Sequence, residues 1–422
     1  MTIVLLVMFL NSVVLGQTSE KVIYLNHADS LVGMEIGNEK AQKLIGHVKF
    51  TQAKTIVTCN TATRYMQSNK IELNGNVVIR QDSSTMYASR GVYYGNEKIA
   101  EAFENVRLEE GGTKLRADYG KYFMDEKKAY FKSNVSAQDS TTTLTSNEFT
   151  YWRDEQKSNA DGNVKIVNAE NGITITGGHL ENYRRQRYSK MTKQPVAIET
   201  DTTASGTIDT VMIMSNVMES YQDSSARLVA TDSVLMLRND GAATAGVATF
   251  FTKLDSISLQ QNPVVWYTRS AWETTQVSGD SMYIKLNNRK LERLHVRGHA
   301  FAGSRADSLF VKRYHQMSGQ EVTMYFNDKS IQRINVEKTA TVLYYLFDGK
   351  KPNGANKTSG DHVDVIFSQK KIGKIKVTSG VEGQYFPEKM IRRKEAEFNL
   401  PGFNWKKVRP VSINISSDKK KS

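Results

Sequence analysis

The chain has 422 residues, of which 39% are hydrophobic and 24% charged, and its formal net charge is +13. These values exclude a disordered chain, and the length predicts two or three folding units. The chain has only 6 prolines and is rich in β-branched and aromatic residues, which fit a half-buried pleated surface. We therefore expect strands and few helices.

The N-terminal segment 2–16 is apolar and carries no charge. It is too short to span a bilayer as a helix, and it ends in Val14-Leu15-Gly16, which suits a signal-peptidase site. We expect residues 1–16 to be a signal peptide and the mature protein to be periplasmic, although no Lys or Arg precedes the apolar run. The single cysteine, Cys59, excludes an internal disulfide.

A repeat with a period of 29 residues follows the signal segment. Its first column is a valine, in the segments GHVKF, GNVVI, ENVRL, SNVSA and GNVKI: Val48, Val77, Val106, Val135 and Val164. Two more apolar columns keep the period, at Phe50, Ile79, Leu108, Ala137 and Ile166, and at Val57, Met86, Leu115, Leu144 and Ile173. Small residues form a column at Cys59, Ala88, Ala117 and Ser146, and aromatic residues at Tyr65, Tyr94, Phe123 and Trp152. Such a fixed period indicates stacked repeats that share one interior.

Apolar residues alternate with period two inside each repeat, as in Ile71 and Leu73, which indicates strands with one buried face. Polar turns, such as 95–98, separate the strands. We expect further hairpin turns at Asn74-Gly75 and Asp161-Gly162, because Gly and Asn tolerate positive φ. The sequence therefore predicts an all-β, solenoid-like stack of antiparallel strands.

The second half repeats with a longer period of about 40 residues, which predicts a second β-unit in tandem. The pattern Met282, Ile284, Leu286 recurs as Val322, Met324, Phe326 and as Val363, Val365, Phe367. The stretch from Tyr188 to about Thr207 breaks both patterns and is interpreted as a junction. We predict units at 17–187 and 205–385, followed by a basic C-terminal extension, 386–422. That extension is either solvated or docks on lipid phosphates or an anionic membrane surface. The chain contains no nucleic-acid-binding motif.

Units such as GNVVIRQDSSTMYASRGVYYGNEKIAEAF and NVRLEEGGTKLRADYGKYFMDEKKAYF resemble the OstA-like (LptA) family. That family includes the periplasmic bridge of lipopolysaccharide transport and the N-terminal domain of the outer-membrane transport protein. The shared features are the Gly-Asn-Val opening, the small-polar pairs Ala88-Ser89 and Ala117-Asp118, and the aromatic strand end before a charged turn. The resemblance covers residues 22–185 and, in a weaker form, 205–385.

The resemblance implies a V-shaped β-jellyroll whose apolar trough holds the acyl chains of lipid A. Exposed edge strands would pair with other lipopolysaccharide-transport β-jellyroll proteins to form a bridge between the membranes. No covalent chemistry and no cofactor are implied, so we do not expect an enzyme. The residues assigned to the trough are Val48, Phe50, Val57, Tyr65, Val77, Ile79, Met86, Tyr94, Val106, Leu108, Leu115 and Phe123. From the residues alone, the same columns favour an ordinary closed core over a lipid-lined groove.

Several polar signals are interpreted as structural. The carboxylates Glu97, Glu126 and Glu155 stack in predicted turns, so we interpret them as solvated and not as a glycosidase pair. His295 and His299 lie in a predicted strand and turn, without an acidic or cysteine partner at ligand spacing, and are interpreted as surface residues. Two alternatives stay open: a structural β-solenoid of the envelope, and a β-solenoid enzyme that acts on acidic polysaccharide.

Overall fold

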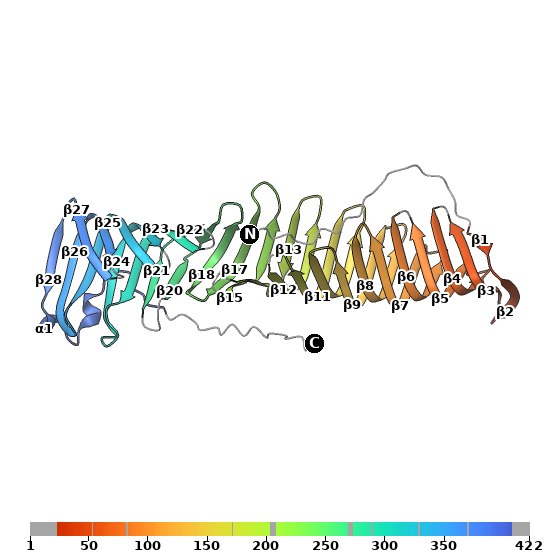
Figure 1. Ribbon diagram of the computed structural model, residues 1–422, viewed down its shortest axis with the longest axis horizontal. Helices are drawn as coiled ribbons and strands as arrows, with labels where there is room; N and C mark the ends of the chain where they lie inside the picture. The colour runs from red at the N-terminus through yellow and green to blue at the C-terminus, as the bar shows by residue number, and fades with distance from the viewer. Residues whose placement is uncertain are drawn as a thin grey trace. The chain divides into compact units, whose positions relative to one another are not determined.

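The computed structural model in Figure 1 describes residues 23–52, 54–81, 83–170, 172–202, 208–268, 273–287, 290–327, 330–368 and 371–406. These residues form 28 strands and two short helices, α1 (Glu388–Ile391) and η1 (Glu395–Phe398). All strand pairings given by the described residues of the two units are antiparallel, as in the ladder of β5 with β6. The all-β prediction is confirmed. The predicted signal segment, 1–16, lies outside the described residues.

The chain divides into two compact units. The N-terminal unit is formed by the described residues within Thr2–Glu199 and Val217–Ala226, and the C-terminal unit by those within Thr200–Asn216 and Arg227–Ser422. No helix among the described residues is long and apolar enough to cross a membrane.

The 29-residue period of the N-terminal unit corresponds to two strands and two turns. After the short edge strands β1 (Tyr24–His27) and β2 (Ser30–Ile36), ten strands follow in chain order. They are β3 (Glu39–Gln52), β4 (Thr55–Tyr65), β5 (Lys70–Gln81), β6 (Ser84–Tyr94), β7 (Ile99–Glu110), β8 (Thr113–Phe123), β9 (Lys128–Gln138), β10 (Thr142–Trp152), β11 (Lys157–Asn168) and β12 (Ile173–Tyr183). Each strand pairs with the next, so the repeats stack side by side (Figure 1).

A bulge in every second strand, from β3 to β11, divides the stack into two arms. In β5, Gly75 and Asn76 both have positive φ, and the pairing register with β6 shifts between Asn74 and Val77. The predicted hairpins at Asn74-Gly75 and Asp161-Gly162 are therefore wrong, because the chain continues as a strand through both sites. Positive φ at two successive residues fits a bulge inside a strand as well as a hairpin turn.

The two arms are named here by the turns that they join. The long-turn arm of β5 is 70–74, next to turns such as 95–98, and its short-turn arm is 77–81, next to turns such as 111–112. Where the arms meet, the valine column Val48, Val77, Val106, Val135 and Val164 is only 0–2% exposed. A side chain at Gly120 would lie 3.2 Å from Val106 Cγ1, so the arms are packed closely there. This apex is a dry core.

Replacing Gly75 by alanine tests the bulge. Gly75 has φ +73°, and an added Cβ would lie 2.6 Å from Asn60 Nδ2. We expect Gly75→Ala to lower the free energy of unfolding by about 1–2 kcal/mol, measured by urea denaturation. Gly33→Ala is the matched control, because nothing lies within 4 Å of the added atom, and we expect a change of less than about 0.5 kcal/mol. Equal losses in the two variants would contradict a specific role of the bulge.

From Tyr188 onward the bent strands are partly replaced by pairs of short strands, which explains why the 29-residue pattern ends there. In the N-terminal unit, β12 pairs through its two arms with two separate strands, β13 (Tyr188–Thr192) and β14 (Val196–Thr202). The strand β13 pairs in turn with β16 (Val217–Tyr221), which belongs to the same unit.

The C-terminal unit contains both short and long strands. The short strands are β15 (Ile208–Met214), β19 (Ser256–Gln260), β20 (Val264–Thr268), β21 (Thr274–Ser278), β22 (Ser281–Asn287), β27 (Lys371–Thr378) and β28 (Glu382–Phe386). The longer ones are β17 (Arg227–Arg238), β18 (Gly241–Phe251), β23 (Lys290–Arg305), β24 (Tyr314–Asn327), β25 (Ser330–Asp348) and β26 (Lys351–Ser368). The strands β23 to β26 are 14–19 residues long, whereas most strands of the N-terminal unit have 11–12 residues. These longer strands account for the period of about 40 residues in the second half of the sequence.

The segment 387–406 packs on the C-terminal unit, although its composition predicts a basic extension. Ile391 and Leu400 are 0% and 3% exposed and lie in one apolar cluster with Phe301, Leu343 and Tyr345. Gln316 fixes the segment through Asn399 Oδ1 and by accepting the Leu400 N–H. The basic residues in between, 392–394, are exposed, so they account for the basic composition of this segment. Residues 407–422 lie outside the described part of the chain.

Candidate functional site

The N-terminal unit contains an open cavity of about 820 Å³ between its two arms. Its lining residues range from Ile23 to Arg153, so it extends across about four repeats. The cavity lies on the side of the apex where the strand arms diverge, because its walls come from both arms. Its volume is within the range of about 300–1,000 Å³ typical of small-molecule sites.

The short-turn arms supply one apolar wall of the cavity. Five of the residues predicted for the trough line it, and they belong to neighbouring strands: Phe50, Val57, Ile79, Met86 and Leu108. They pair across the strands, as in Val57 with Ile79 and Met86 with Leu108, so they form a continuous apolar stripe. Except for Phe50, they are partly exposed to the cavity.

The long-turn arms supply the opposite wall, and sequence reasoning did not identify it. This wall includes Tyr93, Ala100, Tyr122 and Phe131. Burial raises the pKa of Tyr93, and the side-chain amide of Gln52 on the opposite arm partly offsets this rise. The phenol is therefore neutral at physiological pH. Small residues such as Ala100 leave room between the arms.

Four predicted trough residues lie deeper than the cavity. Val48, Val77, Val106 and Leu115 are 0–3% exposed and do not line it. Their role in the structure is to pack the apex and the interior wall behind it. The same sequence columns therefore serve two purposes, a dry core near the bulges and a cavity lining farther out.

The three predicted aromatic residues Tyr65, Tyr94 and Phe123 are not among the residues that line the cavity. They lie on the outer face, where lysines approach the rings: Lys70 Nζ is 5.0 Å from the Tyr65 ring centroid and Lys128 Nζ is 5.0 Å from that of Phe123. The residues next to two of them in sequence, Tyr93 and Tyr122, face inward instead. A shift of one residue along a strand exchanges the two faces.

Charged side chains surround the turn-side rim of the cavity. Lys98 and Lys127, which line it, form ion pairs with Asp125 and Asp154 of the next turn, at 2.8 and 2.9 Å. These carboxylates are 71% and 67% exposed, so the interpretation of the turn acids as solvated holds for this neighbouring column. Because each of these lysines is paired with a carboxylate, the rim is polar and its charges are balanced. Apolar walls next to a polar rim suit an amphiphile with a polar head.

Toward β11 and β12 the interior closes. Leu144, Ile166 and Ile173 are 3–5% exposed and do not line the cavity. Tyr151 lines the cavity near this end, and its buried hydroxyl has no hydrogen-bond partner among the described residues. Burial is the main cause that raises the pKa of Tyr151, so the hydroxyl stays protonated. It can therefore donate a hydrogen bond to a ligand oxygen.

His299 and Cys59 play structural parts. His299 is 86% exposed and lies 3.0 Å from Asp280, and the described residues include no group of three or more side chains able to hold a metal. Cys59 is buried, and its thiol donates to the Thr61 carbonyl oxygen at 3.3 Å.

The buried thiol gives a test of packing around Cys59. Burial raises the pKa of Cys59 to about 11, so about one thiol in a thousand is ionised at pH 8, against about a quarter for an ordinary cysteine. We expect iodoacetamide to label the native protein at pH 8 at least about 100-fold more slowly than the urea-unfolded protein. Rapid labelling of native protein would contradict this packing.

A stack of bent antiparallel strands around an apolar cavity defines the N-terminal unit as a repeat-built β-trough. Residues 20–176 match the family model described as OstA-like protein, less than half of the chain but almost the whole stack from β1 to β12. This segment is therefore OstA-like, which confirms the resemblance seen in the sequence. A search of curated proteins gave no significant match.

Proposed function

We propose that the N-terminal trough binds the acyl chains of lipopolysaccharide and carries this lipid through the periplasm toward the outer membrane. The observation that carries the proposal is the apolar cavity of about 820 Å³ between the two arms. The OstA-like match supports a role in lipid transport. Nothing in this role requires a covalent step, so the protein acts as a carrier and not as an enzyme.

The energetics of the cavity suit an acyl chain. Each buried methylene contributes about 0.8 kcal/mol, so a chain of roughly a dozen methylenes gives on the order of 10 kcal/mol before ordering costs. Lys98 and Lys127 at the rim lie where a polar head would remain in water. The alternative of a purely structural solenoid predicts a filled interior throughout, and it accounts for the segment near Ile166 but not for the cavity walls.

Photo-crosslinking in the cell envelope tests the carrier role. A photoreactive amino acid at Leu108, which lines the cavity, is expected to give adducts with lipopolysaccharide. The matched control is Arg107, the adjacent residue, whose guanidinium lies 4.3 Å from the Tyr87 ring centroid. Arg107 does not line the cavity. Equal adduct yields at the two positions, or none at either, would contradict lipid binding in the trough.

The edge of the N-terminal unit supports the bridging part of the proposal. Within the described residues β1 and β2 pair with β3 alone, and β2 exposes Leu31, Val32, Met34 and Ile36 by 37–51%. An exposed apolar edge strand is a template for another strand. A partner protein of the same β-jellyroll type would extend the trough by pairing with this edge.

Charges on the edge strand test bridging separately from lipid binding. The double variant Val32→Lys, Met34→Lys is expected to abolish crosslinks from a photoreactive residue at Leu31 to a second protein. Lipid adducts from Leu108 should persist, because the trough itself is unchanged. Protein crosslinks that survive the double substitution would contradict pairing through this edge.

A further inference from the structure

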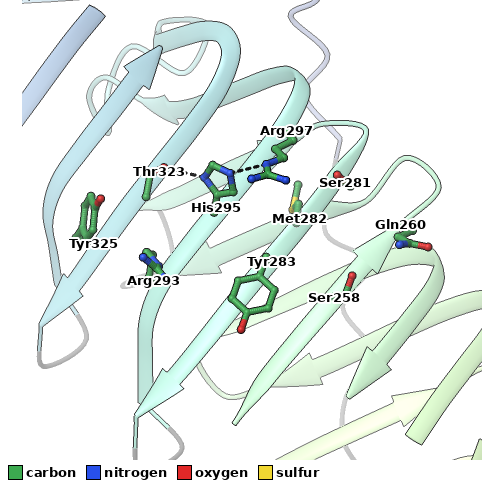
Figure 2. A pocket seen from close by; sticks show the side chains of 10 residues that line it. All are labelled: Ser258, Gln260, Ser281, Met282, Tyr283, Arg293, His295, Arg297, Thr323 and Tyr325. Atoms are coloured by element: carbon green, nitrogen blue, oxygen red, sulfur yellow. Dashed lines mark hydrogen bonds between the residues drawn. The ribbon is translucent and has the colours of Figure 1, made fainter. Parts of the chain in front are cut away.

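The outer face of the C-terminal unit contains a second hollow, of about 630 Å³. Figure 2 shows its side chains standing on strands β19, β22, β23 and β24. Pairing places Ser258, Tyr283, His295 and Thr323 in one row across these strands. The alternate residues Ile284 and Leu294 are 8% and 2% exposed on the opposite, inner face. The hollow is therefore open to the outside and is separate from the unit's apolar interior.

The lining is cationic, aromatic and rich in hydroxyl groups. It includes Arg293 and Arg297, the rings of Tyr283 and Tyr325, and no carboxylate. Arg293 has no ion-pair partner among the described residues. The nearby carboxylate of Glu321 lies 2.8 Å from Lys338 and 3.7 Å from His295. It therefore offsets part of the positive charge at the centre of the hollow, while Arg293 keeps its own charge.

A hydrogen-bond chain fixes the centre of this site (Figure 2). Arg297 Nε donates to His295 Nε2 at 2.9 Å, so this nitrogen is an acceptor and the proton of the neutral ring is on Nδ1. His295 Nδ1 lies 2.9 Å from Thr323 Oγ1 and donates to it. Burial, followed by repulsion from Arg297, lowers the pKa of His295, which keeps the ring neutral at pH 7. These hydrogen bonds hold the Arg297 side chain at the hollow.

We propose that this hollow binds a phosphorylated saccharide. Guanidinium groups bind phosphate with directed, charge-assisted hydrogen bonds. Tyr283 and Tyr325, which are 36% and 37% exposed, offer both a flat ring and a hydroxyl. The hydroxyls of Ser258 and Ser281 can bond to sugar hydroxyls, and Met282 is the only aliphatic side chain that the described residues contribute to the lining. This site goes beyond the acyl-chain site of the N-terminal unit, and it does not depend on it.

Calorimetric titration of the full chain tests the site with a glucosamine disaccharide that carries two phosphates. We expect Arg293→Ala to weaken binding at least about tenfold and Arg293→Lys to restore part of it. The matched control is Arg333→Ala, because Arg333 already pairs with Asp364 at 2.7 Å outside the hollow, and its affinity should equal that of the wild type. The dephosphorylated disaccharide should bind much more weakly.

A second experiment asks whether the bound saccharide is the head of a lipid or a free molecule. It uses the Ile79→Asp variant, in which the trough no longer binds acyl chains. Binding of both the free disaccharide and micellar lipid A there, each lost in Arg293→Ala, identifies a lipid head as a ligand of the hollow. Binding of the free disaccharide alone identifies a soluble saccharide. Equal affinities of the Arg293→Ala and Arg333→Ala variants, or no binding of the disaccharide at millimolar concentration, would overturn the proposal whether or not the trough binds lipid.

Discussion

Replacing Ile79 with aspartate is expected to weaken acyl-chain binding by more than about 100-fold while the protein stays folded. Ile79 lines the cavity on the short-turn arm and is partly exposed to it. In the empty trough the carboxylate remains hydrated, but a bound acyl chain would remove its water, which costs several kcal/mol, and every 1.4 kcal/mol is tenfold in affinity. Displacement of a fluorescent fatty acid measures the affinity, and circular dichroism checks the fold.

Two neighbours of Ile79 on the same strand serve as controls. Val77 is 2% exposed at the apex, so Val77→Asp buries an unpaired charge and is expected to cost roughly 3–5 kcal/mol of stability. Val78 pairs with Tyr87 and lies on the outer face, so Val78→Asp should preserve both fold and binding. If Ile79→Asp unfolds the protein as Val77→Asp does, the trough is a closed core and the carrier proposal fails.

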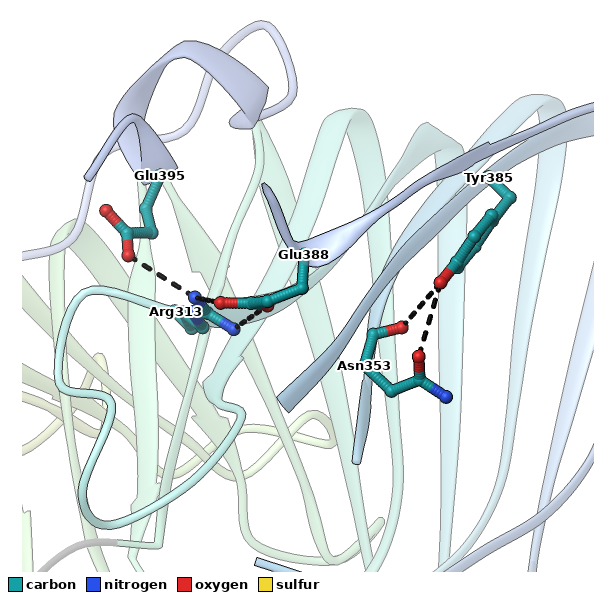
Figure 3. A network of polar contacts seen from close by, with 5 residues as sticks. All are labelled: Arg313, Asn353, Tyr385, Glu388 and Glu395. Atoms are coloured by element: carbon teal, nitrogen blue, oxygen red, sulfur yellow. Dashed lines mark hydrogen bonds and ion pairs between the residues drawn. The ribbon is translucent and has the colours of Figure 1, made fainter. Parts of the chain in front are cut away.

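Replacing Arg313 with methionine is expected to release the C-terminal segment and to lower the free energy of unfolding by about 3 kcal/mol. Figure 3 shows Arg313 between Glu388 and Glu395. Its Nη1 and Nη2 donate to the two oxygens of Glu388 at 2.9 and 2.8 Å, and its side chain is 2% exposed. Glu388 is 26% exposed, so water already solvates part of its charge. The loss of stability is therefore expected at the low end of the range for breaking a buried ion pair.

Limited trypsin digestion and urea denaturation measure the effect of Arg313→Met. Cleavage near Arg392 and Arg393 should become at least about tenfold faster, because the segment that contains them loses its anchor. Arg333→Met is the control, since its ion pair with Asp364 is half exposed and contributes less than about 1 kcal/mol. Unchanged cleavage in Arg313→Met would show that the apolar contacts of Ile391 and Leu400 hold the segment without the ion pair.

The stacked β-fold could be predicted from the sequence because every repeat contains the same apolar alternation. Val48, Val77 and Val106 occupy equivalent places at the apex, as the equal spacing indicates. The bends could not be predicted, since Asn74-Gly75 has the same chemistry in a hairpin and in a bulge. Whether Asn74-Gly75 forms a hairpin or a bulge depends on the strands that pair on both sides of β5. Those pairings exist only in the folded stack.

The candidate site could be predicted only in part. Period two assigns Ile79 and Leu108 to the interior, but it does not distinguish a filled interior from an open one, because that depends on the distance between the arms. The aromatic positions show the other limit. Tyr93 and Tyr94 are adjacent and equally apolar, so the sequence pattern alone did not reveal that Tyr93 faces the cavity. The Arg293 hollow has no repeat signal, since its residues come together only through strand pairing.

Native mass spectrometry of the mature protein, purified gently from its own cell envelope, tests the central claim most directly. The account predicts adducts with the mass of lipopolysaccharide or lipid A, which reappear when delipidated protein is titrated with lipid A. These adducts should be absent when Ile79→Asp is combined with Arg293→Ala, which removes the outer hollow as a second binding site. A clean apo mass that takes up no lipid on titration would contradict the account and leave a structural β-solenoid as the better description of this protein.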